Sequence, residues 1–152
     1  MKPDETDDTF DAAAEEAWVA EQRNKVADYL QREGVQHGEI GEWPAWHLQP
    51  HLAVLAIESR VAPGRMGWWA ISGDCPTDYV SFHDADHPRE AMRHFARQWA
   101  EVSSYMLRGE PHPETTIGTP DQWPELGDLL RRRSQILQQW ADDDSIWNDR
   151  NG

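Results

Sequence analysis

Polar side chains that could do chemistry are concentrated in one segment, Gly67–Tyr79, which reads GWWAISGDCPTDY. The candidate binding residues are Trp68, Trp69, Asp74, Thr77, Asp78 and Tyr79. Carboxylates and hydroxyls at a strand end, next to an aromatic wall, are common in small-ligand sites. A rigid, self-bonded turn is the favoured interpretation, because Gly73 permits unusual φ angles, Pro76 stiffens the chain and the Asp74 carboxylate can accept nearby backbone N–H groups.

A second group of reactive side chains precedes a predicted helix. It comprises His83, Asp84, Asp86 and His87, with His94 further along the helix. Imidazoles and carboxylates are metal ligands. No cysteine pair or HExxH-like helix accompanies them, which favours capping and surface roles. We therefore predict neither a metal site nor a cofactor, and keep His87 and Arg89 as binding candidates beside the polar segment.

Nucleophilic catalysis has little support in the sequence. Cys75 could act as a nucleophile with His83 or His87 as its base, but nothing in the spacing requires that pairing. The chain contains no P-loop, GxGxxG, GxSxG or zinc-finger pattern. These observations favour a protein that is not an enzyme.

Arg133 falls inside the apolar stripe of a predicted C-terminal helix. A buried guanidinium needs a carboxylate and further acceptors. We predict a structural ion pair, and the candidate partners are Asp74, Asp78 and Glu58. A guanidinium that faces a ligand is the alternative.

The elements that must position these residues follow from hydrophobic periodicity. Helical spacing begins near Phe10 and ends near Glu33, with Gly34 as the C′ residue. Three strands are predicted at Leu52–Val61, Gly67–Ser72 and Asp78–Phe82. Their short connections favour an antiparallel meander, with a type II turn at Pro63-Gly64 between the first two.

The segments around these elements are predicted to be irregular. Gly34–Gly41 is a loop, and the next nine residues form an extended segment that Trp43 and Trp46 anchor. Pro44 and Pro50 exclude a central strand there.

Two helices complete the predicted fold. One begins at Pro88, with Asp86 or His87 as its cap, and its apolar residues step by three and four as far as Met106. The other follows a capping box at Thr119–Gln122 and ends at 142–144. We predict an α+β fold with an N-terminal helix, a three- to four-stranded antiparallel meander and two C-terminal helices packed on the sheet. One domain would span residues 10–147, between disordered tails at 1–9 (acidic) and 148–152.

Charge and cysteine content limit the function classes. The 152 residues carry a formal net charge of −14, and residues 1–42 hold 12 acidic against four basic residues. This balance disfavours nucleic acid and anionic membranes as partners and suits a basic protein. One cysteine cannot form an internal disulfide, and no apolar run resembles a signal peptide or a membrane span. A cytoplasmic protein is expected.

Several short motifs together resemble a known family. They are Pro44-Ala45-Trp46, Gly67-Trp68-Trp69, Ser72-Gly73-Asp74, Pro76-Thr77-Asp78-Tyr79, His87-Pro88-Arg89-Glu90-Ala91 and the LLRRR stretch at 129–133. Over roughly residues 18–147 the chain resembles an uncharacterised bacterial family, domain of unknown function number 4826. The resemblance implies a bacterial, stand-alone domain and brings no activity. In that family the position of Cys75 usually holds an apolar residue, which further disfavours a cysteine nucleophile.

Three functional hypotheses remain open from the sequence. The first is a non-enzymatic binding protein, such as an inhibitor or immunity-type protein, whose acidic surface pairs with a basic partner. The second is a small-ligand-binding or hydrolytic protein with a tryptophan-lined site near Asp74 and Asp78. The third is a structural or assembly subunit, for which the nine tryptophans suggest a homodimer through exposed rings.

Overall fold

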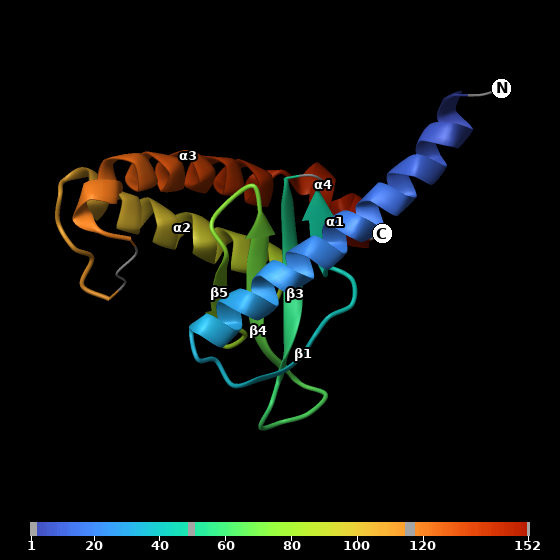
Figure 1. Cartoon of the computed structure of the whole chain (residues 1–152), viewed down its shortest axis with the longest axis horizontal. Helices are drawn as coiled ribbons and strands as arrows, with labels where there is room; N and C mark the ends of the chain where they lie inside the picture. The colour runs from blue at the N-terminus through green and yellow to red at the C-terminus, as the bar shows by residue number, and fades with distance from the viewer. Residues whose placement is uncertain (1–2, 49–50, 115–117, 152) are drawn as a thin grey trace. The chain divides into compact units, whose positions relative to one another are not determined.

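The computed structural model describes residues 3–48, 51–114 and 118–151, and side chains between residues 12 and 147 of these ranges (Figure 1). The chain divides into two compact units, Met1–Phe82 and His83–Gly152. The first contains the N-terminal helix and the antiparallel sheet, and the second contains the two long C-terminal helices, which confirms the α+β class. The packing of the two C-terminal helices on the sheet stays a prediction.

The sheet of the first unit has five strands in place of the three or four predicted. They are β1 (His37–Ile40), β2 (Trp46–Leu48), β3 (Leu52–Ser59), β4 (Met66–Gly73) and β5 (Asp78–Ser81). The antiparallel meander β3–β4–β5 is confirmed. Both extra strands pair with β3 and lie inside the segments predicted to be irregular. Both are short, and the register of β1 against β3 shifts once, as at a bulge. β2 is an edge strand, a position in which flanking prolines are tolerated.

Two predicted glycine positions have the expected geometry. Between β3 and β4, the N–H of Arg65 donates to the carbonyl of Ala62 (3.0 Å), and Gly64 has φ +84°. This is the predicted type II turn. At the end of the first helix Gly34 has φ +73°, and the N–H of Val35 donates to the carbonyl of Leu30 (3.0 Å). The helix therefore ends in a Schellman motif at the predicted C′ glycine.

Helix α1 (Pro3–Arg32) covers one face of this sheet (Figure 1). Its contact with the strands is an apolar core of Val26, Leu30, Ala53, Leu55, Ile57 and Ala70. Adjacent strand residues point to opposite faces. Trp68 accordingly packs against this core, whereas Trp69 lies 6.1 Å from the ring of Phe82 and is buried. The prediction that Trp68 and Trp69 cannot enter one core is confirmed.

Helix α1 begins seven residues earlier than the periodicity predicted. Residues 3–9, predicted as part of a disordered tail, are helical. Asp4 and Glu5 in the first turn favour a helix N-terminus, and the Ala12–Ala14 run has high helix propensity. Among the described side chains, the contacts of α1 with this core begin at Trp18, and the N-terminal part of the helix extends past the sheet (Figure 1).

The second unit is built on two helices that pack along each other, α2 (Pro88–Leu107) and α3 (Trp123–Asp142). The predicted apolar stripe of α2 is buried, and His87 caps the helix through its side chain. The capping box at Thr119 is confirmed, since its N–H donates to the Gln122 side chain (3.0 Å), although it opens a 3₁₀ turn, η1 (Pro120–Gln122), that leads into α3. Gly127 allows the close approach of the two helices, because a Cβ there would lie 3.0 Å from the Cβ of Met106.

A further short helix, α4 (Asp144–Asn151), follows α3 directly. It takes in most of the predicted 148–152 tail. Residues 1–2 and 152 of the two tails lie outside the described residues, as do residues 49–50 of the extended segment and 115–117 of the loop before η1. None of the helices in the described ranges is long and apolar enough to cross a membrane.

Candidate functional site

The first part of the predicted polar segment holds the fold together. The Ser72 hydroxyl is fully buried and donates to the side-chain carbonyl of Gln22 on α1 (2.6 Å), which ties the helix to β4. Gly73 lies against the backbone of β3, and the N–H of Asp74 donates to the carbonyl of His51 (2.8 Å). The Asp74 side chain itself is exposed. These contacts fix the end of β4, and the bonding of the Asp74 carboxylate to its own loop stays a prediction.

The second part forms a small cluster with α1. Asp78 is half-buried, and its carboxylate accepts hydrogen bonds from the backbone N–H of Tyr79 (2.8 Å) and from the Tyr29 hydroxyl. The rings of Tyr29 and Tyr79 meet edge to face at 6.0 Å. Burial, with the negative charges of Asp78 and Glu33, raises the pKa of Tyr29 far above that of a free tyrosine. The pKa of Tyr79 is raised by burial and then by Glu33 and Asp78.

These tyrosines predict a loss of stability at alkaline pH. A free tyrosine titrates near pH 10, so above that pH the unfolded chain loses protons that folded Tyr29 and Tyr79 keep. The free energy of unfolding should therefore be constant up to about pH 9 and fall as the pH rises further. Urea unfolding between pH 8 and 11 measures the slope, and Tyr29→Phe should flatten it. An equal slope in wild type and variant would contradict the coupling.

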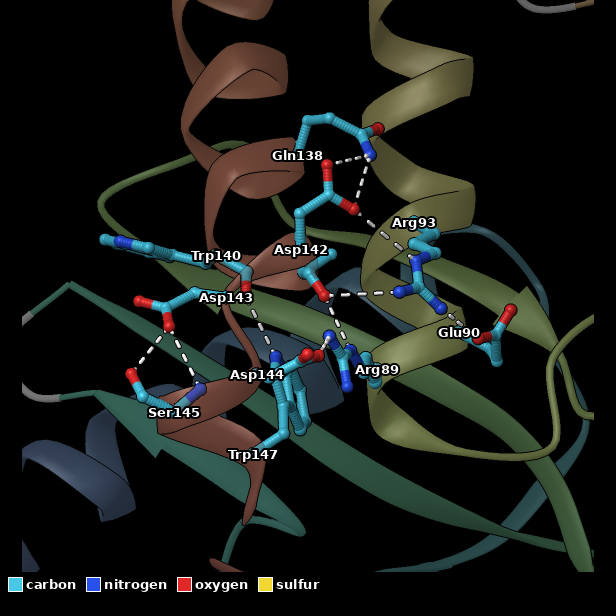
Figure 2. Close-up of polar contacts among 11 residues, drawn as sticks. Arg89, Glu90, Arg93, Gln138, Trp140, Asp142, Asp143, Asp144, Ser145 and Trp147 are labelled. Carbon is cyan, nitrogen blue, oxygen red and sulfur yellow. Dashed lines mark hydrogen bonds and ion pairs between the residues drawn. The ribbon is translucent and has the colours of Figure 1, made fainter. Parts of the chain in front are cut away.

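His87 and Arg89, the other predicted binding residues, lie in the second unit, where Arg89 belongs to a polar network (Figure 2). The Nε of Arg89 donates to the carbonyl of Ala141 at the end of α3 (2.6 Å), and its terminal nitrogen pairs with Asp144. The guanidinium also lies 5.9 Å from the ring centre of Trp147. The hydrogen bond from Arg89 lowers the pKa of the Asp144 carboxyl. Arg89 thus caps the C-terminal end of α3.

The rest of this network supports the same junction. Arg93 pairs with Glu90 and also donates to the carbonyl of Ala141 (3.4 Å) (Figure 2). The indole N–H of Trp147 donates to the carbonyl of Trp140 (2.9 Å). The last carbonyls of a helix lack partners within the helix, and cationic side chains are favourable beside them. The geometry around His87 and Arg89 therefore explains how α2, α3 and α4 meet.

Arg133 is half-buried on α3. Of its predicted partners, Glu58 accepts a hydrogen bond from the N–H of Gly64 (3.1 Å) in the turn after β3. The ion pair of Arg133 with a sheet carboxylate stays a prediction. Its neighbours Arg131 and Arg132 both pair with Asp128 one turn earlier, and these contacts lower the pKa of that carboxyl.

The second unit also contains an open cleft of ≈ 490 Å³ along α2. Its walls include Asp84, His94, Arg97, Glu101, His112 and Glu114. Most of these side chains are ionisable, which suits a small polar ligand better than an apolar one. Asp84 and His94 were considered in the sequence as possible metal ligands, whereas the other four were not predicted to form a site.

His112 is the most constrained side chain of the cleft. Its ring packs edge to face on Tyr105 (5.0 Å), and its Nδ1 accepts the backbone N–H of Glu114 (3.1 Å). In the neutral ring the proton is therefore on Nε2, which lies 3.5 Å from Oε1 of Glu101. The cleft thus has an oriented imidazole N–H beside a carboxylate. Within the described ranges, no three His, Cys, Asp or Glu side chains are grouped as a metal ion would need.

A third group of side chains lies where α1 meets β2 in the first unit. The Nε2 of His47 lies 2.8 Å from a carboxylate oxygen of Glu15, and the ring centre of His47 lies 6.1 Å from that of Trp18 and 5.4 Å from that of Trp43. We call Glu15, Trp18, Trp43 and His47 the aromatic corner. The sequence singled out Trp43 only as a packing anchor, but its side chain is 47 % exposed. Glu15 and His47 are 32 residues apart along the chain, so no local sequence pattern connects them.

Comparison with known proteins places the chain in a family without assigning it an activity. A family model described as Domain of unknown function (DUF4826) matches residues 12–147. No curated protein and no solved structure matches the chain.

Proposed function

The chain belongs to the family Domain of unknown function (DUF4826), and from this premise we propose that it is a non-catalytic binding protein whose acidic surface engages a basic protein. The observation that carries the proposal is the first half of α1. This half extends past the sheet, and residues 3–17 contain seven acidic and no basic residues. Ala12, Ala13, Glu16 and Ala17 are exposed along it.

A helix of this kind is suited to association with a positively charged surface. Seven like charges repel one another along residues 3–17, and this half of α1 has no apolar stripe in its sequence to bury. Lysine and arginine side chains of a partner would relieve that repulsion and would be attracted over a distance set by the ionic strength. An inhibitor or immunity-type protein that binds a basic partner, the first hypothesis from the sequence, fits this chemistry.

The polar cleft on α2 supports a second candidate, the binding of a small polar ligand. It combines a guanidinium, Arg97, with the carboxylates of Asp84, Glu101 and Glu114. A zwitterionic or otherwise doubly charged small molecule would complement such a lining. This candidate moves the predicted ligand site away from Asp74 and Asp78 to a different part of the chain.

Salt-dependent binding of a nona-arginine peptide tests the first candidate. We expect wild-type protein to bind the labelled peptide in fluorescence anisotropy at 50 mM salt, and the affinity to fall at least tenfold at 300 mM. Neutralising three acids of α1 (Asp4→Asn, Glu5→Gln, Asp8→Asn) should weaken binding several-fold at low salt.

The matched control removes the same amount of charge from the second unit. It carries Asp86→Asn, Glu110→Gln and Glu125→Gln, three exposed positions outside α1. If this control weakens binding as much as the α1 variant, net charge rather than α1 attracts the peptide, and the proposal fails. Arg97→Gln removes a cation from the cleft, so a clear gain in affinity for the peptide would favour the cleft, and binding as in wild type would favour α1.

A further inference from the structure

Trp43 occupies an unusual position for a large aromatic side chain. Nearly half of its surface is exposed, although the tryptophans at 46, 69, 99, 123 and 147 are all buried. In the described ranges three large apolar side chains are exposed, Trp43, Val61 and Leu107, and Trp43 is the aromatic one of the three. A polar environment surrounds it, since the same corner contains Glu15 and His47.

The support beneath Trp43 is rigid. Its ring stands at 86° to the ring of His47, and His47 is buried and paired in register with Ala53 of β3. Next to it, Pro44 is buried and the N–H of Ala45 donates to the carbonyl of Val54 (2.9 Å). An aromatic ring that is already ordered loses little conformational freedom when a partner binds.

A carboxylate belongs to the same corner as the Trp43 ring. Glu15 and Trp43 both contact the same imidazole, from α1 and from the segment before β2 respectively. The side chain of Glu15 is 36 % exposed, so its carboxylate contacts His47 and is also accessible to solvent. The face of an indole ring attracts a cation, and a nearby carboxylate adds a charge-assisted hydrogen bond. Together they complement a cation on a flexible side chain.

We propose that Trp43 and Glu15 form a docking point for an arginine side chain of a basic protein, a role that rests on the binding function proposed above. Arginine fits better than lysine, because its planar guanidinium stacks on an indole and donates sideways to a carboxylate at the same time. The acidic half of α1 begins at this corner and supplies the long-range attraction. The corner then contributes the short-range contact that aromatic and charged residues provide at interfaces.

The indole N–H signals in ¹H–¹⁵N NMR spectra test the docking point. The indole signal of Trp43 is assigned as the one that is missing in Trp43→Ala. We expect nona-arginine to shift this signal in the wild-type protein, and nona-lysine to shift it less. The affinity for nona-arginine should fall about fivefold in Trp43→Ala. Glu15→Gln keeps a hydrogen-bond acceptor for His47 but removes the charge, and it should also weaken binding. Val61→Ala, an exposed apolar truncation in the turn after β3, should bind as wild type does.

The outcomes separate this inference from the function on which it rests. If wild type binds the peptide, but Trp43→Ala binds equally well and its indole signal does not move, the docking point is wrong and the acidic surface remains. If wild type does not bind nona-arginine at low salt, both are wrong. Equal shifts and equal losses with nona-lysine would overturn the arginine preference.

Discussion

Gly73→Ala is expected to lower the free energy of unfolding by about 3–5 kcal/mol, the largest effect of any single methyl addition to the first unit. Gly73 has φ +137°, a conformation that L side chains rarely adopt. A Cβ there would lie 2.9 Å from the Cα of Leu52 and closer still to the carbonyl oxygen of His51. Both neighbours are backbone atoms of the paired strand, so no rotamer change can make room. Urea unfolding of the purified variant measures the loss.

Gly64→Ala is the matched control for this prediction. Gly64 also has a positive φ, +84°, but nothing lies within 4 Å of the position of its Cβ. Only the left-handed conformation should be penalised, at about 1 kcal/mol. Since domains are stable by about 5–15 kcal/mol, this control should stay folded. Equal losses in the two variants would show that the close approach at Gly73 has no energetic consequence.

The strands that were predictable from sequence are those with a strong local signal. Leu52–Ser59 and Met66–Gly73 each contain eight residues with continuous apolar or aromatic runs, and glycine and proline mark the turn between them. β1 and β2 have four and three residues. β5 is as short as β1, but it was predictable because Tyr79, Val80 and Phe82 favour strands. The segments of β1 and β2 carry too little periodicity of their own, and their strand geometry depends on pairing with β3, which follows them in the sequence.

The ends of the long helices were harder to predict than their centres. The start of α1 has no apolar stripe, so its acidic composition resembled a tail, although favourable capping charges and alanines support a helix there. Asp142–Asp144 does end α3 as predicted, but the chain continues directly into α4. The side chain that stabilises this join, Arg89, lies more than fifty residues earlier in sequence.

For the candidate sites, the sequence located the polar segment but not its contacts. It raised both a turn and a ligand site for Ser72–Tyr79, and it did not predict the hydrogen bond that ties Ser72 to Gln22 on α1. That bond joins residues 50 positions apart in the sequence, and the contact between Glu15 and His47 joins residues 32 positions apart. Such contacts follow from the packing of α1 on the sheet and have no local sequence signature.

Many of the motifs that carry the family resemblance have structural roles in this chain. Gly67 approaches the backbone of Ser59, Ser72 and Gly73 fix β4 against its neighbours, and His87 and Arg89 organise the helix junction. A motif of that kind identifies a fold without identifying an activity. The projecting half of α1 and the aromatic corner lie outside these motifs, and both carry acidic side chains.

The junction of the second unit yields the other prediction with a large effect. Arg89→Ala is expected to lower the free energy of unfolding by about 2 kcal/mol, or Tm by about 4–8 °C in a chain of this length. The change removes the bond to the Ala141 carbonyl, the pair with Asp144 and the contact with Trp147. The Arg89 side chain is only 19 % exposed, so water replaces these contacts poorly. Differential scanning calorimetry gives the shift.

Two further variants separate the contributions of Arg89. Arg89→Lys keeps the charge, but an ammonium group cannot reproduce the fork that reaches the Ala141 carbonyl and Asp144 together, so we expect an intermediate loss. Asp144→Asn removes only an exposed partner and should cost less than either change at Arg89.

The protonation of Asp144 provides an independent readout of the same contact. Arg89 holds the pKa of this carboxyl below its usual range, so the stabilisation is present above about pH 4 and is lost as the pH falls through the lowered pKa. In Arg89→Ala the Asp144 carboxyl should titrate at a higher pH, which NMR detects directly. An unchanged titration together with an unchanged Tm would mean that the end of α3 is held by Arg93 and Trp147 without Arg89.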